Sequence, residues 1–524
     1  MTNATRHRGV LSNLTLLLPA VALALIGVGL VLYLTRGGAG AGGDSAWYVM
    51  GAQNLLAGNG FARFSGGGEL RPITGFPPLF SLVLAGISAA GLEPLTGAQL
   101  LNTILFGANL LLAGLLIFKA SQSRWATVIG VLLVLTSANL IESHSWVMSE
   151  PLYIFLSLLV AHLISQGIPA GDRRLFVIAG LFSAAAILTR YSGFSLVAAG
   201  AVCIAFLGPR GARWRLSSST LFSVFGLVPP LWWLWTRASD GGTLANRQVI
   251  LRSMNPELLL AYQRELVTWA FARQLPLSWR PRAIIAATIA AIGPFYFLVS
   301  RLRRSRFRLP RVDSYGEALP WFLGVYLVAY LGVLAANSLF LDAATTLGAP
   351  SRYLAPAYVA LVILATVTTA DLVNSVKTTR LPAAFALSLG LLLVALHLGQ
   401  SLEILSDDGL NLGYVDVKRN QPELVAGLSE IDPSIPIISN NPEMIFILAN
   451  RPAYLLPIRV DAYTQSERDD YEQNIKANRR RLEDGAILVI LGNPDEGALE
   501  AMNDLNVTPL QGFSAAMFFR AGEG

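Results

Sequence analysis

Apolar residues gather in runs of about 20 that recur along the first 400 residues of the chain. A run of this length allows a helix to cross the hydrocarbon core of a bilayer. The pattern therefore predicts an α-helical polytopic membrane protein with about eleven transmembrane helices. We expect these helices near residues 14–35, 98–118, 125–141, 147–166, 175–189, 193–208, 216–236, 283–300, 319–337, 353–373 and 381–398.

The first apolar run, Leu14–Thr35, also has some features of a secretory signal, because small residues follow it at Ala39-Gly40-Ala41. Its roughly 20 apolar residues exceed the 7 to 15 that are usual for a signal peptide and are enough to span a bilayer. We therefore expect a retained first helix.

The segment Pro77–Gly91 is apolar, but it is only about 15 residues long and starts with two prolines. If this segment does not cross the membrane, every second loop lies on the same side of the membrane as the N-terminus. All of these loops are basic, as cytoplasmic loops are. The basic groups of these loops are Arg6/Arg8, Lys119/Arg124, Arg173/Arg174, Arg210/Arg213/Arg215, the cluster from Arg301 to Arg311, and Lys377/Arg380. We therefore expect a short helix at the outer interface, and we look for chemistry in the loops of the extracytoplasmic side.

Composition separates two parts of the chain. Only 14% of the residues are charged, against roughly a quarter in soluble domains, which argues against a cytosolic enzyme and against nucleic-acid binding. Residues 1–400 hold 29 Lys+Arg and 13 Asp+Glu, whereas residues 401–524 hold 10 and 20. Strand-like runs alternate with helical stretches after residue 401. We expect a transmembrane catalytic domain at 1–400 and a small soluble extracytoplasmic α/β domain at 401–524.

Asp44 lies at the start of a predicted helix in the first extracytoplasmic loop, after Gly42-Gly43 and before Trp47 and Tyr48. One interpretation is a helix N-cap, since Asp is favoured there. The other is a catalytic base at the membrane interface. Both interpretations stay open at this point, and one residue can serve in both ways.

A second acidic pair, Glu142 and Glu150, brackets a short turn that also contains His144. Ser149-Glu150-Pro151 is typical of a helix start, so local structure explains part of this pattern. Acidic residues are scarce in the first 400 residues, however, and two of them with a histidine at one turn indicate a candidate site.

Arginines on the extracytoplasmic side run against the usual charge distribution of membrane proteins. Arg190 ends one predicted span and Arg352 begins another, so both are expected near the lipid headgroups, where an unpaired charge is costly. They either extend toward the headgroups or bind an anion, and phosphate is the commonest anion at that depth. The single cysteine, Cys203, excludes an intramolecular disulfide.

Several short motifs resemble the GT-C superfamily of membrane glycosyltransferases, in particular the branch similar to protein O-mannosyltransferases and lipid A aminoarabinose transferase. The matching segments are Asp44-Ser45-Ala46-Trp47-Tyr48, Ala52–Phe61, Phe76–Phe80, Met148-Ser149-Glu150-Pro151-Leu152, Leu188-Thr189-Arg190-Tyr191 and Arg352-Tyr353-Leu354-Ala355-Pro356. Their order and their shared side of the membrane carry the resemblance, which spans most of the chain.

The resemblance implies a sugar donor linked to a polyprenyl phosphate, a glycan, lipid or protein acceptor, surrounding membrane lipids, and transfer with inversion at the extracytoplasmic face of the cell membrane. It assigns the catalytic base to Asp44. The acidic pair at the short turn adds Glu142 and Glu150 as further catalytic candidates. Some members of the superfamily add metal-binding acidic pairs, but no Asp-x-Asp follows Asp44. No cofactor is therefore assigned, and a divalent metal stays an open alternative. The candidate substrate-binding residues are Tyr48, Arg71, His144, Arg190, Tyr191, Arg352 and Tyr353.

Two other classes of function compete with a transferase. A transporter or flippase would place ionisable groups at the bilayer midplane, where only His162 lies well inside a predicted span. A non-catalytic scaffold would use residues 401–524 to bind a partner and Asp44 only as a cap.

Overall fold

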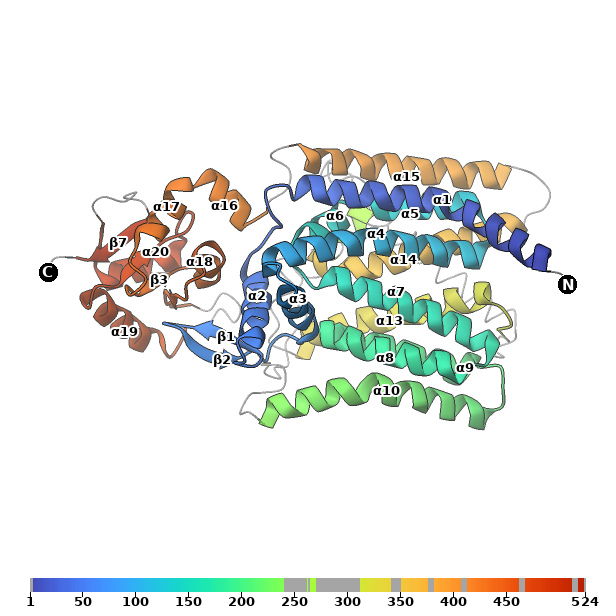
Figure 1. Cartoon of the computed structure of the whole chain (residues 1–524), viewed down its shortest axis with the longest axis horizontal. Helices are drawn as coiled ribbons and strands as arrows, with labels where there is room; N and C mark the ends of the chain where they lie inside the picture. Colours follow the sequence, from blue (N-terminus) through green and yellow to red (C-terminus); the bar gives the residue numbers. More distant parts are fainter. Residues whose placement is uncertain are drawn as a thin grey trace. The chain divides into compact units, whose positions relative to one another are not determined.

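The computed structural model describes residues 3–239, 262, 264–269, 312–340, 350–375, 381–406, 412–460, 467–510 and 517–522, which form two compact units (Figure 1). The first, here called the helical unit, comprises Met1–Leu34, Thr74–Leu79 and Leu100–Leu410. The second, the mixed unit, comprises Thr35–Ile73, Phe80–Gln99 and Asn411–Gly524. The structure thus groups residues 35–73 and 80–99 with the C-terminal part of the chain, whereas the expected boundary at residue 400 leaves them in the membrane part.

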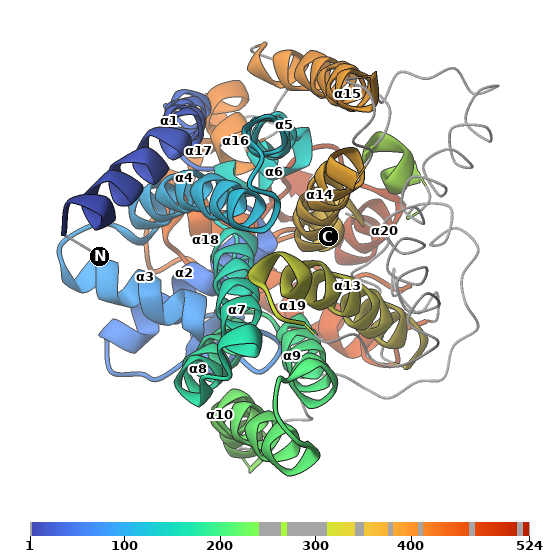
Figure 2. The same ribbon diagram turned by 90° about the vertical axis from the view of Figure 1, so that its right-hand side faces the viewer.

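Helices of different lengths make up the described part of the helical unit. They are α1 (Asn3–Leu34), α4 (Pro94–Ser121, which begins in the mixed unit), α5 (Arg124–Leu135), α6 (Ala138–Ser145), α7 (Glu150–Ala170), α8 (Arg173–Thr189), the 3₁₀ turn η1 (Tyr191–Gly193), α9 (Phe194–Leu207), α10 (Ala212–Ser239), α13 (Tyr315–Phe340), α14 (Pro350–Ser375) and α15 (Leu381–Leu405). Figure 2, which looks along many of these helices, shows α8 on one side of α7 and α13 and α14 on the other.

Five of the described helices are long and apolar enough to cross a membrane: Pro94–Ser121, Glu150–Ala170, Tyr315–Phe340, Ser351–Ser375 and Leu381–Glu403. The pair α5 and α6, bent by 57°, adds a sixth if it forms one broken span. Large apolar side chains are exposed on α15, among them Leu381 and Phe385, and their natural surroundings are lipid. The chain is a multi-pass membrane protein.

Ten of the eleven expected spans coincide with described helices, and the remaining one, 283–300, lies outside the described residues. Since only five or six of these helices are long and apolar enough by themselves, the number of crossings stays a prediction.

The ambiguous segment Pro77–Gly91 forms the 11-residue helix α3 (Leu79–Ala89). At 1.5 Å per residue, α3 is about 16 Å long, roughly half of the hydrocarbon core of a bilayer. The expectation of a short helix is confirmed, while its place relative to a membrane stays a prediction.

Close approach between helices depends on small residues. A Cβ atom added at Gly180 of α8 would lie 2.6 Å from the backbone oxygen of Phe222 in α10. The glycine therefore lets the two backbones come together, which is a common way for membrane helices to gain packing energy.

The mixed unit contains a five-stranded sheet of order β4-β3-β5-β7-β6. Its strands are β3 (Ile437–Ser439), β4 (Tyr454–Leu455), β5 (Ile487–Val489), β6 (Val507–Pro509) and β7 (Phe518–Ala521), and its helices are α16 (Tyr414–Asn420), α17 (Pro422–Glu430), α18 (Pro442–Ala449), α19 (Tyr471–Glu483) and α20 (Glu496–Leu505). Strands β3, β4 and β5 run parallel, whereas β7 is antiparallel to both β5 and β6.

Alternation along the strands builds one apolar core on each face of this sheet. Leu488 of β5 belongs to the core that includes residues of α19 and α20, and its neighbours Ile487 and Val489 belong to the core that includes residues of α17 and α18. The same unit holds α2 (Gly43–Leu56), α3 and the hairpin of β1 (Ala62–Ser65) and β2 (Glu69–Pro72).

Candidate active site

A buried carboxylate joins two arginines in the helical unit. Glu150, in the first turn of α7, has a side chain that is 1% exposed. Its Oε1 accepts a hydrogen bond from Nε of Arg352 in α14 and lies 2.8 Å from Nη1 of Arg190, which follows α8. The structure thus brings together three of the residues expected from sequence, and we call them the Glu150 cluster.

Local sequence places each member at a helix end. Pro151 follows Glu150 at the start of α7, where proline's missing N–H has no intrahelical partner to lose. Arg190 is the C-cap of α8 in an extended conformation. Gly193, two positions after Tyr191, packs closely on α8. A Cβ atom added at Gly193 would lie 2.6 Å from the backbone nitrogen of Ile187. The chain can therefore leave α8 abruptly and direct Arg190 to one side.

Further groups from the same helices support the two guanidiniums. Nη1 of Arg190 donates to Oγ of Ser149 at 3.2 Å. The Tyr353 ring centroid lies 5.6 Å from Cζ of Arg190 and 5.5 Å from Cζ of Arg352, a range typical of cation–π contacts. The hydroxyl of Tyr330 in α13 donates to the Tyr353 backbone oxygen at 2.7 Å, which fixes the start of α14.

The charge of the Glu150 cluster is +1, since one carboxylate faces two guanidiniums. The arginine side chains retain 13% and 21% of their exposure. The second carboxylate oxygen, Oε2 of Glu150, is buried and has no hydrogen-bond partner among the described residues. An anion can therefore bind to the partly exposed guanidiniums, and phosphate matches the planar donor geometry of arginine.

His144 has a different environment from the one expected for a substrate ligand. Its side chain is buried, Nδ1 donates to the Leu140 backbone oxygen at 2.6 Å, and Nε2 accepts from the Asn109 amide at 3.1 Å. Both ring nitrogens thus have protein partners, which favours a structural role in which α6 is fixed to α4. Glu142 lies half-buried on α6.

Two asparagines of α4, missed in the sequence analysis, hold this turn. Asn102 donates to the backbone oxygens of Trp146 and Met148 at 2.7 and 3.1 Å, and Asn109 donates to that of Pro151 at 3.1 Å. Amides seven residues apart in an apolar helix lie on the same face of that helix. Their spacing in the sequence could therefore have identified them as a pair with a common role.

Asp44 lies in the mixed unit, half-buried in the first turn of α2. The interpretation of Asp44 as the N-cap is wrong, because α2 begins at Gly43 and the extended N-cap residue is Gly42. The carboxylate gains instead from the partial positive charge of the helix N-terminus, worth about 0.3–1 kcal/mol at a surface.

The helix α2 is held on two sides. Tyr48 is 2% exposed and packs edge-on against Phe80 of α3 with ring centroids 4.9 Å apart, so its ring belongs to the core of the mixed unit. On the other side, Nε1 of Trp47 donates to Glu443 of α18 at 3.3 Å. Cζ of Arg63 lies 4.0 Å from the Trp47 ring centroid, and burial lowers the pKa of Arg63 while the Glu443 carboxylate opposes that shift.

The remaining candidates differ in exposure. Arg71 in β2 is exposed and forms a 3.4 Å ion pair with Glu69, an arrangement that contributes little to stability. Tyr191 begins η1 directly after Arg190.

Among the described residues, no three His, Cys, Asp or Glu side chains come together in a way that could hold a metal ion.

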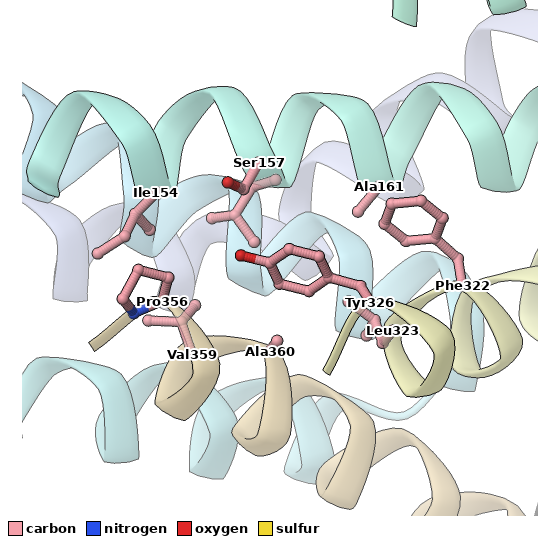
Figure 3. A pocket seen from close by; sticks show the side chains of 10 residues that line it. Ile154, Ser157, Ala161, Phe322, Leu323, Tyr326, Pro356, Val359 and Ala360 are labelled. Carbon is pink, nitrogen blue, oxygen red and sulfur yellow. The ribbon is translucent and has the colours of Figure 1, made fainter. Parts of the chain in front are cut away.

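A crevice between α7, α13 and α14 is too small for a substrate. Figure 3 shows Tyr326 pointing into it between Ser157 and Val359. Its volume is about 10 Å³, close to the minimum for one water molecule. The Tyr326 hydroxyl lies 3.3 Å from that of Tyr153, so the crevice is part of the packing beneath the Glu150 cluster.

This arrangement of helices defines a GT-C-like fold, the fold of a class of membrane glycosyltransferases. Among solved structures, the chain is similar to ArnT from Cupriavidus metallidurans bound to undecaprenyl phosphate, with a TM-score of 0.52 and 13% identity over 95% of this chain and 97% of that one. The apo form of ArnT gives a TM-score of 0.48 at 15% identity, covering 99% and 98% of the two chains.

A third similar structure is the oligosaccharyltransferase AglB from Archaeoglobus fulgidus, in complex with an inhibitory peptide and a dolichol-phosphate. Its TM-score is 0.47 at 12% identity, covering 90% of this chain and 69% of that one. No family model matches the sequence, and no curated protein matches it. The likeness therefore concerns the fold.

The Glu150 cluster leads to a prediction about stability. Glu150→Gln removes the charge that both arginines share and should destabilise the full chain by about 3 kcal/mol, the lower end of the range for breaking a buried ion pair, because both arginines keep some access to water. Thermal unfolding in detergent measures the change. Glu496→Gln, at the exposed first turn of α20, is the matched control and should have little effect. Equal unfolding temperatures for the two variants would show that Glu150 does not hold the arginines.

Proposed function

We propose that the protein is a glycosyltransferase that moves a sugar from a polyprenyl-phosphate donor to a glycan, lipid or protein acceptor, with inversion, at the extracytoplasmic face of the cell membrane. The observation that carries this proposal is the pair Arg190 and Arg352, ordered by one buried carboxylate within a GT-C-like fold. The undecaprenyl phosphate in the similar ArnT structure supports the choice of donor.

The donor phosphate would bind to Arg190 and Arg352. When the bond between the anomeric carbon and the phosphate oxygen breaks, its electron pair stays on the lipid phosphate, and the two guanidiniums stabilise the added charge. A phosphate leaves as an anion, so the leaving group needs no general acid. Tyr353 flanks both guanidiniums and Tyr191 follows Arg190, so both can shape the donor site.

Asp44 would be the base that takes the proton from the acceptor hydroxyl as its oxygen bonds to the anomeric carbon. It is half-buried and stands on a helix that Tyr48, Trp47 and Glu443 hold in place. Glu150 is less suited to that role, because one of its oxygens is engaged by both arginines. We assign Glu150 to positioning, and Glu142 remains the alternative base.

Within this proposal, the side of the membrane on which the active site lies gives the first prediction. A cysteine in place of Ser123, in the α4–α5 turn, should resist a membrane-impermeant thiol reagent added to intact cells, while one in place of exposed Ser434 should react. The native Cys203 is buried and should not react with the reagent. Both positions should react after permeabilisation. Equal labelling of the two in intact cells would contradict the proposed face of the active site.

Donor binding gives the second prediction. Arg190→Ala and Arg352→Ala should each weaken binding of a polyprenyl phosphate by about 1.5–3 kcal/mol for every charge-assisted bond lost, or at least about tenfold. Lysine should restore only part of the affinity, since it is a point charge and not a planar fork. Arg124→Ala, at the exposed first residue of α5, is the control. Unchanged affinity in both alanine variants would assign these arginines to protein structure alone.

Proton transfer gives the third prediction. Asp44→Asn keeps the shape of the side chain and should lower the transfer rate by about a hundredfold or more, while donor binding survives. Because Asp44 is not the N-cap, the stability change should be the loss of a favourable helix-end charge, about 0.3–1 kcal/mol. Steady-state transfer and thermal unfolding are measured on the same preparation. Near-normal transfer would move the assignment of the base to Glu142.

A further inference from the structure

A second group of arginines lies at the opposite end of α8 from Arg190. Arg173 and Arg174 are the first two residues of α8. Arg210 lies in the turn between α9 and α10, and Arg213 and Arg215 lie in the first turn of α10. Figure 1 shows the starts of α8 and α10 at the same end of the helices. The group of four arginines 173, 174, 210 and 213 is called the basic patch below. All four are exposed.

Specific contacts order this patch. Nη2 of Arg173 donates to Oγ of Ser217 at 2.6 Å, and its Nε donates to Oγ of the buried Ser218 at 3.1 Å. Cζ of Arg173 and Cζ of Arg210 lie 5.6 and 5.2 Å from the ring centroid of Trp214. An added Cβ at Gly171 would lie 3.3 Å from Pro209 and 3.4 Å from Nε of Arg210, so the two turns are in close contact.

Within the described residues, the positive charge of the patch is not balanced by ion pairs with carboxylates. Between residues 171 and 215 the only acidic residue is Asp172, and its side chain accepts from the backbone N–H of Arg174 as the N-cap of α8. Among the described residues, no carboxylate forms an ion pair with any of the four arginines. This contrasts with Arg190 and Arg352, which share Glu150.

The spacing of the two arginine groups matches a bilayer. α8 has 17 residues and therefore rises about 25 Å between Arg173 and Arg190, close to the roughly 30 Å hydrocarbon core. Trp214, half-buried between two guanidiniums, has the amphipathic ring that is favoured at membrane interfaces. Lipid phosphates at that depth are anions of the right geometry for arginine.

We propose that the basic patch binds the phosphate headgroup of an anionic phospholipid, at a site separate from the proposed donor site. Arg173, fixed by the two serine hydroxyls, and Arg210, fixed by the Trp214 ring, contact the phosphate oxygens. Arg174 and Arg213 add long-range attraction. The acyl chains lie along the exposed apolar side of α10, which includes Leu216.

Binding of phosphatidylglycerol to the purified full chain in neutral detergent tests this proposal, with phosphatidylcholine of the same acyl chains as the comparison lipid. Phosphatidylglycerol should bind more tightly. Arg173→Gln and Arg210→Gln should each weaken it about fivefold, the effect expected for one basic residue near an anionic surface. Arg124→Gln, at the exposed start of α5, and Arg352→Ala, at the start of α14, should leave it unchanged.

The double variant Ser217→Ala/Ser218→Ala keeps every charge and removes only the hydroxyls that orient Arg173. It should therefore also weaken binding of phosphatidylglycerol. This variant still tests the proposal if an arginine variant fails to fold. Four results would overturn the proposal. The first two are no preference for phosphatidylglycerol and an equal loss in Arg124→Gln. The third is equally tight binding of soluble glycerol phosphate, which would indicate a general anion site. The fourth is loss of binding in Arg352→Ala, since the lipid would then occupy the donor site.

Discussion

The helical unit depends on one requirement: a carboxylate with almost no exposed surface must be paired with a positive charge. Glu150 stands at the first turn of a helix long enough to span a membrane, where an unpaired charge would cost several kcal/mol. Two arginines meet this requirement, one from the end of α8 and one from the start of α14. Three helix ends far apart in sequence are thereby held together, and the arginines are ordered as a consequence.

Amides of α4 impose a second constraint on the same region. Asn102 donates to two backbone oxygens of the α6–α7 turn, and Asn109 donates to the backbone oxygen of Pro151 in the first turn of α7. His144 completes the arrangement from the other side, since it bonds both to Asn109 and to its own helix. Hydrogen bonds from buried side chains therefore hold the turn before Glu150 in an apolar setting, which explains how α7 begins at a fixed position.

Sequence patterns predicted the positions of the described helices well, because the position and length of an apolar run are visible directly in the sequence. They also predicted Glu150, Arg190 and Arg352 as candidate residues, because a charge at the end of an apolar run is conspicuous. Tyr353 became a candidate through its place in a motif shared with a known family. Patterns along the chain could not show that Glu150 pairs with both arginines, since the partners are 40 and 202 residues away. For the same reason, Tyr48 and His144 were expected at a substrate, whereas the structure places both in packed surroundings. The N-cap assignment of Asp44 failed by two residues, a usual uncertainty at helix ends.

Charge balance suggests why the proposed donor site contains a carboxylate at all. A sugar linked to a lipid through a phosphodiester carries one negative charge, and the lipid phosphate released by transfer gains a second ionisable oxygen. Two arginines without Glu150 would present a charge of +2 and would favour the more highly charged product. With Glu150 the cluster presents +1, which neutralises the bound donor and still lets the guanidiniums respond to charge that develops during transfer. Only interactions that strengthen on the way to the transition state raise the rate. In the proposed reaction, the carboxylate that orders the arginines would therefore also limit how tightly they retain the product.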